Sequence, residues 1–200
     1  TADHDQARDL FARAFHYLTL LALPITVGMA VLAGPIVRLV YGPTYDPAVS
    51  LLTIAILALP FTFWNFLFAS LLNAIDRQVQ NTINVAIAMV LSLGGNLIAV
   101  PLWGTAGAAW VILIANAGLA LVNALTSQRH FPLPWGAMMR SLLQVGTACT
   151  GVVVVLLLMQ SFGLVPQLIA GIGVGCILLL LLGAVRIRDL QTLITTFRPR

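Results

Sequence analysis

The chain has 200 residues, of which 60% are apolar and only 8% are charged, and its formal net charge is +4. An ordinary soluble domain is about 25% charged, so this sequence lacks the polar surface that a water-soluble fold requires. All ten basic residues are arginines at the ends of apolar runs, with no contiguous basic stripe, which indicates contact with a membrane surface and not with nucleic acid. We therefore expect an integral membrane protein.

Six apolar runs follow one another along the chain, and each is long enough to cross a hydrocarbon core of about 30 Å as a helix. Helices are expected because lipid offers no partner to unpaired backbone groups, and the runs are too long and continuous for barrel strands. In chain order, the predicted spans are 17–37, 50–74, 79–100, 105–125, 141–159 and 168–185. The expected fold is an all-α bundle of six transmembrane helices over 17–185.

Proline and glycine mark the connectors and two positions inside the spans. The segment 41–47 breaks any helix after the first span, and Pro101 with Gly104 ends the third. Pro24 and Pro60 lie inside the first and second spans. Each removes one backbone donor, so each is expected to kink its helix.

Polar segments flank the bundle at both ends. Residues 1–16 form a polar lead on the cytoplasmic side, which is expected to be helical. Residues 186–200 form a cytoplasmic tail whose apolar residues recur at roughly helical spacing. Such a tail is expected to lie flat on the inner membrane surface. The chain starts without an initiator methionine or a signal peptide, so we expect it to be part of a longer protein.

The arginines predict the orientation in the membrane. Only Arg38 falls on one side of the predicted bilayer, and the positive-inside rule places the other side in the cytoplasm. Both chain ends are then cytoplasmic, in a bacterial inner membrane, and the turn 41–46 faces outward. The arginines of the cytoplasmic side are Arg8, Arg13, Arg77, Arg129, Arg140, Arg186, Arg188, Arg198 and Arg200.

The groups that enzymes need are missing from the predicted spans. No span carries an acidic or basic residue in its middle, and the three histidines are isolated from one another. A membrane transferase usually needs a carboxylate base or a metal ligand near the interface. No phosphate-binding glycine motif occurs. We expect no catalysis, no metal and no cofactor.

Asparagines are the main polar groups at membrane depth. Asn116 and Asn123 are seven residues apart and so share one helical face. Two interpretations stay open for such amides: hydrogen bonds between helices, worth about 0.6 kcal/mol each, or the lining of a hydrophilic cavity. As a set they favour the cavity. The candidates for its lining are Asn65, Asn96, Asn116 and Asn123, with Arg38 at the outer boundary.

Three motifs over 23–109 carry a family resemblance. The first is Leu-Pro-Ile at 23–25 followed by Ile-Val-Arg-Leu-Val-Tyr-Gly at 36–42, and the second is Leu-Leu-Asn-Ala-Ile-Asp-Arg at 71–77. The third is Asn-Leu-Ile-Ala-Val-Pro-Leu-Trp-Gly-Thr-Ala-Gly-Ala-Ala at 96–109. In this order and spacing they resemble the bacterial polysaccharide flippases of the multidrug/oligosaccharidyl-lipid/polysaccharide exporter superfamily. The part from 131 to 200 matches that family only in hydropathy.

The resemblance implies a two-lobed transporter of 12–14 helices around a central cavity, of which this chain is the C-terminal lobe without its N-terminal lobe. It further implies that the protein flips a polyprenyl-diphosphate-linked saccharide, a lipid-linked oligosaccharide, across the bacterial inner membrane by alternating access. Membrane lipid and the missing N-terminal lobe are then its expected partners. Since this half offers only Arg38 as a cation near the cavity, contacts to the diphosphate are expected from the missing lobe.

Other functions remain alternatives at this point. One is a cation-coupled multidrug exporter of the same superfamily, which would often carry an intramembrane carboxylate that this chain lacks. Another is a non-transporting membrane scaffold in polysaccharide assembly. A membrane glycosyltransferase is disfavoured by the missing carboxylates.

Overall fold

The computed structural model describes residues 2–159 and 173–175, and these residues contain helices and no strand. The predicted sixth span, 168–185, falls almost wholly outside the described residues, and the predicted tail, 186–200, falls entirely outside them. In chain order the elements are α1 (Ala2–Tyr41), the short 3-10 helix η1 (Pro43–Tyr45), α2 (Pro47–Ile56), α3 (Leu59–Ala74), α4 (Gln78–His130) and α5 (Trp135–Leu158).

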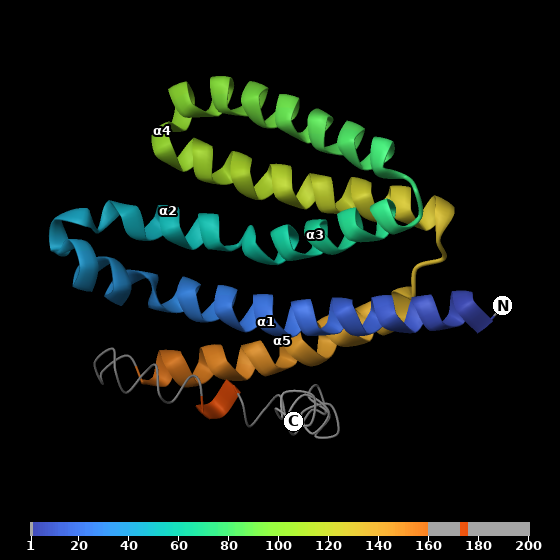
Figure 1. The fold of residues 1–200 in the computed structure, drawn as a ribbon. Helices are drawn as coiled ribbons and strands as arrows, with labels where there is room; N and C mark the ends of the chain where they lie inside the picture. The colour runs from blue at the N-terminus through green and yellow to red at the C-terminus, as the bar shows by residue number, and fades with distance from the viewer. Residues whose placement is uncertain (1, 160–172, 176–200) are drawn as a thin grey trace, which may run out of the picture.

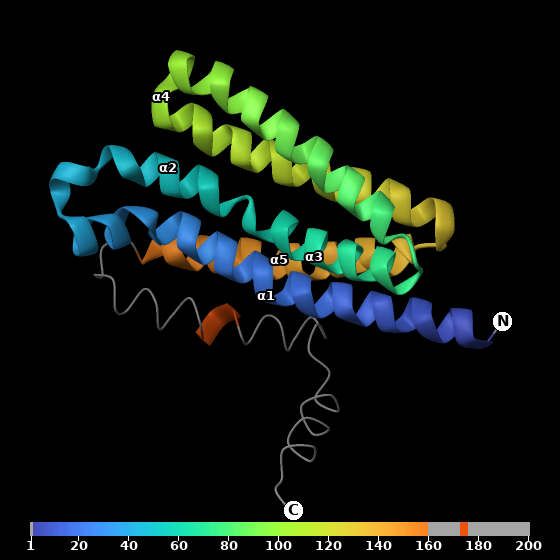
Figure 2. The same ribbon diagram turned by 45° about the horizontal axis from the view of Figure 1, so that its top comes forward.

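The long helices run roughly side by side in one bundle (Figures 1 and 2). α1 packs against α5 on one side and against α2 and α3 on the other, while α2 and α3 also contact α4. Within the described residues, four helical segments are long and apolar enough to cross a membrane: Asp5–Tyr41, Pro47–Ala74, Gln78–His130 and Trp135–Leu158. The expectation of an all-α membrane bundle is therefore confirmed for this part of the chain.

α4 doubles back on itself and so supplies two of the predicted spans (Figure 1). The reversal occurs at Gly104, whose φ of 59° and ψ of −144° are non-helical. Side chains strongly disfavour this region of backbone conformation, so the turn depends on glycine. The two arms, 78–103 and 105–130, contain the predicted spans 79–100 and 105–125.

A second glycine lets the arms of α4 meet closely beside this turn. A Cβ added at Gly107 would overlap the backbone carbonyl of Ala99 on the opposite arm. Both residues are buried. Small residues at such contacts let helix backbones approach closely, and the van der Waals packing this allows is one of the terms that hold helices together in lipid.

The predicted span 50–74 is one helical path with a break before Pro60. α2 ends at Ile56 and α3 begins at Leu59. Because Pro60 has no N–H to bond the carbonyl one turn back, the chain tightens there, and Leu57 and Ala58 donate to carbonyls only three residues earlier, at 3.2 and 3.1 Å. α1, in contrast, stays helical through Pro24.

An aromatic core lies at one end of the bundle. It is formed by buried residues of α1, α3, the end of α4, the α4–α5 connection and α5: Phe11, Phe15, Phe68, Ala124, Phe131, Leu133 and Met138. Phe11 lies 5.8 Å from Phe68 and 6.4 Å from Phe131, measured between ring centroids. α1 thus runs without a break from the predicted polar lead 1–16 into the first span, and two phenylalanines of that lead belong to the core.

The described arginines divide between the two ends of the bundle. Arg38 lies in the last turn of α1. The others lie at the end that holds the aromatic core, in the first half of α1, in the α3–α4 turn, in the last turn of α4 and near the start of α5: Arg8, Arg13, Arg77, Arg129 and Arg140. For this part of the chain, the helices place the arginines as the predicted orientation requires, but the orientation itself stays a prediction.

Candidate functional site

The first amide cluster joins α3 to the second arm of α4. The side-chain amide of Asn65 donates from Nδ2 to the backbone oxygen of Asn116 at 3.0 Å. The hydroxyl oxygen of Thr62 lies 3.3 Å from Asn116 Oδ1 and 3.1 Å from the carbonyl oxygen of Ala58 in its own helix, and its one proton serves either acceptor. Asn65 is buried, and its Oδ1 has no hydrogen-bond partner within the described residues. The cluster therefore offers an unused acceptor at the contact of two helices.

The second amide cluster joins the two arms of α4. Asn84 Nδ2 donates to Asn123 Oδ1 at 2.9 Å and also lies 3.2 Å from the hydroxyl oxygen of Thr126. Asn123 is only 1% exposed. These amides satisfy one another inside the hairpin, as interhelical hydrogen bonds in membranes commonly do.

The remaining candidates lie apart from these clusters. Asn96 donates to the carbonyl of Ser92 in its own helix at 2.8 Å. Arg38 forms a two-point ion pair with Asp46, with Nε–Oδ1 at 2.8 Å and Nη2–Oδ2 at 3.0 Å. The structure thus brings Asn65 and Asn116 together, and it does not bring Asn96, Asn123 or Arg38 to them.

Asn84 is the partner that the predicted candidate set left out. It lies 20 residues before Gly104, and Asn123 lies 19 residues after it. In a hairpin that reverses at Gly104, these two positions face each other across the arms. The register of the hairpin is therefore the sequence signal that could have found the pair.

A double-mutant cycle on Asn84 and Asn123 is expected to show coupling of about 1 kcal/mol, within the range for buried amide pairs in membrane proteins. Either Asn84→Leu or Asn123→Leu leaves one amide buried without this partner, whereas the double variant removes both. The double variant should therefore lose less stability than the two single losses summed. Unfolding of the full-length protein in mixed detergent micelles measures all four forms, and strictly additive losses would contradict the pairing.

The ion pair between Arg38 and Asp46, near the C-terminal end of α1, shifts the pKa of the exposed Asp46 carboxylate. The hydrogen bonds from Arg38, with its charge, hold the pKa of Asp46 below its ordinary value. Because the folded-state pKa is the lower one, the pair stabilises the turn above the ordinary pKa and is lost as pH falls through the folded-state pKa. The side chains are 63% and 45% exposed, so this stabilisation is small.

Arg38→Gln is accordingly expected to raise the pKa of Asp46 towards the ordinary value and to leave the melting temperature at neutral pH unchanged. The carboxyl carbon shift of selectively labelled aspartate, followed by NMR across acidic pH, reads the titration. Asp46→Asn identifies the resonance. A pKa that stays low in Arg38→Gln would mean that another group depresses it.

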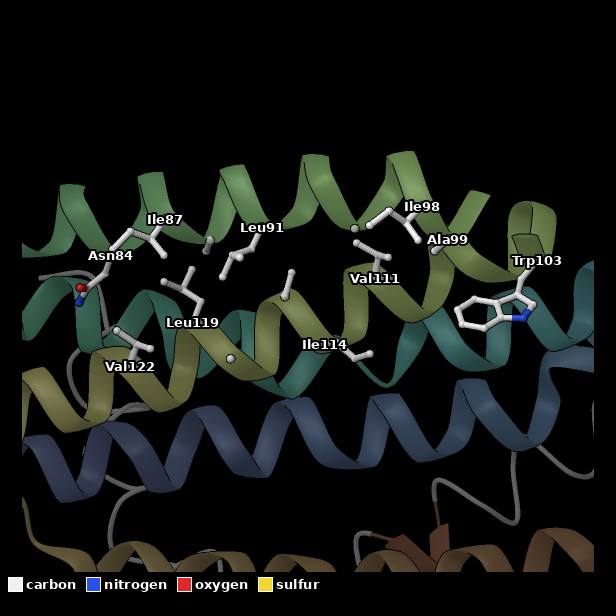
Figure 3. A pocket seen from close by; sticks show the side chains of 14 residues that line it. Asn84, Ile87, Leu91, Ile98, Ala99, Trp103, Val111, Ile114, Leu119 and Val122 are labelled. Carbon is white, nitrogen blue, oxygen red and sulfur yellow. The ribbon is translucent and has the colours of Figure 1, made fainter. Parts of the chain in front are cut away.

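A groove runs between the two arms of α4. Its volume is about 450 Å³, and all of its lining residues come from these arms. Asn84 is the one amide among them, and the rest of the lining is apolar, with Trp103 at the other end of the groove (Figure 3). Asn65, Asn96, Asn116 and Asn123 do not line it.

Long apolar helices with amides buried between them define a helical, multi-span integral membrane protein. A family model described as lipid II flippase MurJ matches residues 1–172. The chain belongs to this lipid II flippase family. The family is part of the superfamily that the three motifs resemble, so the predicted resemblance is confirmed. A flippase is a transporter, in agreement with the expected non-enzymatic class, and the family places the chain in the bacterial inner membrane.

A solved structure supports the same fold. The chain is similar to a lipid II flippase MurJ in an inward closed conformation, with a TM-score of 0.75 and 19% sequence identity. The similarity covers 94% of this chain and 41% of that protein, so the chain spans less than half of its length. No curated protein matches the chain.

Proposed function

We propose that the full-length protein moves a lipid-linked saccharide of the lipid II class between the leaflets of the bacterial inner membrane. The match of the flippase family model to residues 1–172 carries this proposal. On this proposal the chain is the C-terminal part of a two-lobed transporter with six spans in this part, and an N-terminal lobe completes the transport path.

The physical problem is to carry a polar saccharide through hydrocarbon while its lipid tail stays in the bilayer. The lumen must offer the saccharide hydrogen bonds in place of those it makes with water. Uncharged polar side chains can do so without the high free-energy cost of burying a charge. The cluster of Asn65, Asn116 and Thr62 suits this need, because its amides and hydroxyl are uncharged and those of Thr62 and Asn116 lie at the exposed edge of the α3–α4 contact. We assign this cluster to the lumen wall and keep Asn96, Asn123 and Arg38 as further candidates.

The proposed orientation places both ends of the chain in the cytoplasm. It is supported by the five described arginines at the end of the bundle that holds the aromatic core, and by Arg38 at the other end. The exposed tyrosines Tyr41 and Tyr45 beside Arg38 suit an outer membrane–water interface. Labelling of single cysteines at Thr44 and Gln128 should place them on opposite membrane faces.

Depletion of the full-length protein in cells tests the transport function. Lipid-linked saccharide should accumulate in the cytoplasmic leaflet, where reagents added to the periplasm cannot reach it. An unchanged distribution between the leaflets would contradict flipping. If saccharide assembly failed while the distribution between the leaflets stayed unchanged, the result would favour a membrane scaffold. If the depleted cells became sensitive to drugs and showed no other change, the result would favour a multidrug exporter.

A further inference from the structure

The exposed face of α3 differs in chemistry from the exposed surface of α4. The structure describes the whole of α3, and five of its residues are exposed, all on one side of the helix: Thr62, Phe66, Ser70, Asn73 and Ala74. None of these five is a leucine, isoleucine, valine or methionine. The first arm of α4, in contrast, exposes mainly aliphatic side chains, among them Val79, Ile83, Val90 and Leu97.

The first four of these α3 residues form a line, which we call the α3 row. Thr62, Phe66 and Ser70 follow one another at four-residue spacing, and Asn73 lies three turns after Thr62. The row rises about 16 Å at 1.5 Å per residue, roughly half of a hydrocarbon core. Thr62 also belongs to the amide cluster, 3.3 Å from Asn116 Oδ1. From there the row runs towards the end of the bundle that holds the aromatic core (Figure 1).

Neither lipid nor a closely packed helix suits the α3 row. Hydrocarbon favours leucine, isoleucine and valine side chains and offers no hydrogen-bond partner to the amide of Asn73. Helices that pack closely in membranes meet along lines of small residues, and Ser70 and Ala74 could take part in such a contact. The ring of Phe66, one turn before Ser70, is however 72% exposed and keeps a second helix backbone away from the row.

We propose that the α3 row guides the saccharide head of the substrate between the cytoplasmic surface and the amide cluster. This proposal rests on the proposed transport function and names residues that contact the sugar in that half of the path. The Ser70 hydroxyl donates to the carbonyl of Phe66 at 2.9 Å, so its lone pairs stay available to accept from sugar hydroxyls. The amide of Asn73 can both donate and accept. The negative face of the Phe66 ring attracts the C–H groups on one side of a sugar ring.

Cysteine accessibility in the full-length protein tests whether water reaches the α3 row. A single cysteine replaces Phe66, Ser70 or Ile83, in a background whose other cysteines, including Cys149 and Cys176, are changed to alanine. Ile83 lies about as far after the α3–α4 turn as Ser70 lies before it, and it is 51% exposed. A charged, membrane-impermeant reagent attacks the thiolate, which forms where water solvates it, so Phe66→Cys and Ser70→Cys should react about tenfold faster than Ile83→Cys.

Protection by substrate tests which ligand the row binds. The reconstituted protein is labelled with and without a lipid-linked saccharide of the lipid II class, and polyprenyl phosphate without sugar is the matched control lipid. Bound sugar excludes the reagent from the space it fills, so the saccharide should slow the reaction of Phe66→Cys and Ser70→Cys about threefold. Polyprenyl phosphate should leave both rates unchanged.

Two substitutions of Phe66 test the role of its ring. Phe66→Leu keeps an apolar side chain and removes the ring, so the rate of flipping should fall about fivefold. Phe66→Tyr keeps the ring face and should flip at close to the parent rate. Thermal unfolding of both variants should match that of the parent protein, because Phe66 is largely exposed.

Three results would each overturn the proposal. The first is Phe66→Cys and Ser70→Cys reacting no faster than Ile83→Cys. The second is a saccharide that gives no protection, and the third is normal flipping by a stably folded Phe66→Leu variant. Any of these together with flipping by the parent protein would leave the proposed function standing with a different path. A parent protein that does not flip would overturn both, so the two failures are distinguishable.

Discussion

Gly107→Ala is expected to destabilise the protein by about 1–3 kcal/mol, the range for an extra group forced into a close-packed contact. The added Cβ would overlap the backbone of Ala99, and backbone in a helix cannot move aside as a flexible side chain can. The arms of α4 would have to separate next to their turn. Unfolding of the full-length protein in mixed detergent micelles measures the loss.

Gly94→Ala is the matched control for this prediction. Gly94 lies on the first arm, and a Cβ there meets nothing within 4 Å. Because alanine is the better helix former by up to about 1 kcal/mol, Gly94→Ala should be neutral or slightly stabilising. Equal stability of Gly107→Ala and the parent protein would show that the arms do not meet at this glycine.

Asn116→Leu is expected to lower the rate of flipping about tenfold while the protein stays folded, a loss of about 1.4 kcal/mol of transition-state stabilisation. Asn65 bonds the backbone oxygen of residue 116, and the substitution leaves that bond between α3 and α4 in place. The variant removes the side-chain amide that we assign to the lumen, together with its contact to the Thr62 hydroxyl and its own bond to the carbonyl of Ile112. Asn116→Gln, which keeps an amide, should retain more of the rate.

This prediction is tested in cells by measuring how the lipid-linked saccharide is distributed between the two leaflets, with protein levels measured in parallel. The double variant Asn65→Leu with Asn116→Leu should be more impaired than either single variant, because it also removes the unpaired acceptor of Asn65. Normal flipping by a stably folded double variant would exclude this cluster from the transport path.

The number and position of the first five spans could be predicted from hydropathy alone. The predicted run 17–37 falls within α1, and 79–100 and 105–125 each fall within one arm of α4. The run 50–74 spans α2 and α3 with the break between them, and 141–159 ends one residue past α5. The polar lead before the first span was expected to be helical, and α1 indeed begins at Ala2. Hydropathy did not predict that Phe11 and Phe15 of this lead pack into the core, because polar residues surround them in sequence.

The effect of proline also depended on context. Pro60 interrupts the helical path, whereas α1 continues through Pro24. Both prolines remove the same backbone donor, so the sequence alone predicted the same kink at both. The break is confirmed at Pro60, while the kink expected at Pro24 stays a prediction because the helix is continuous there.

The sequence did not predict which of the candidate amides lie together. The lining of a cavity by these amides stays a prediction, and the structure shows how they pair. Helical spacing placed Asn116 and Asn123 on one face, yet one bonds towards α3 and the other towards the first arm of α4. Residues two turns apart on one face of the second arm therefore meet different partners. The pairing of Arg38 with Asp46 likewise depended on the turn that brings them together.

Flipping by the purified full-length protein is the most direct test of the central claim. Vesicles are prepared with a fluorescent lipid-linked saccharide of the lipid II class in both leaflets, and a membrane-impermeant reagent then quenches the outer fluorescence. With the protein present, quenching should proceed beyond the outer-leaflet half as inner molecules are flipped outward, and more slowly with Asn116→Leu. Quenching that stops at the outer leaflet, with correctly folded protein in the bilayer, would contradict the account.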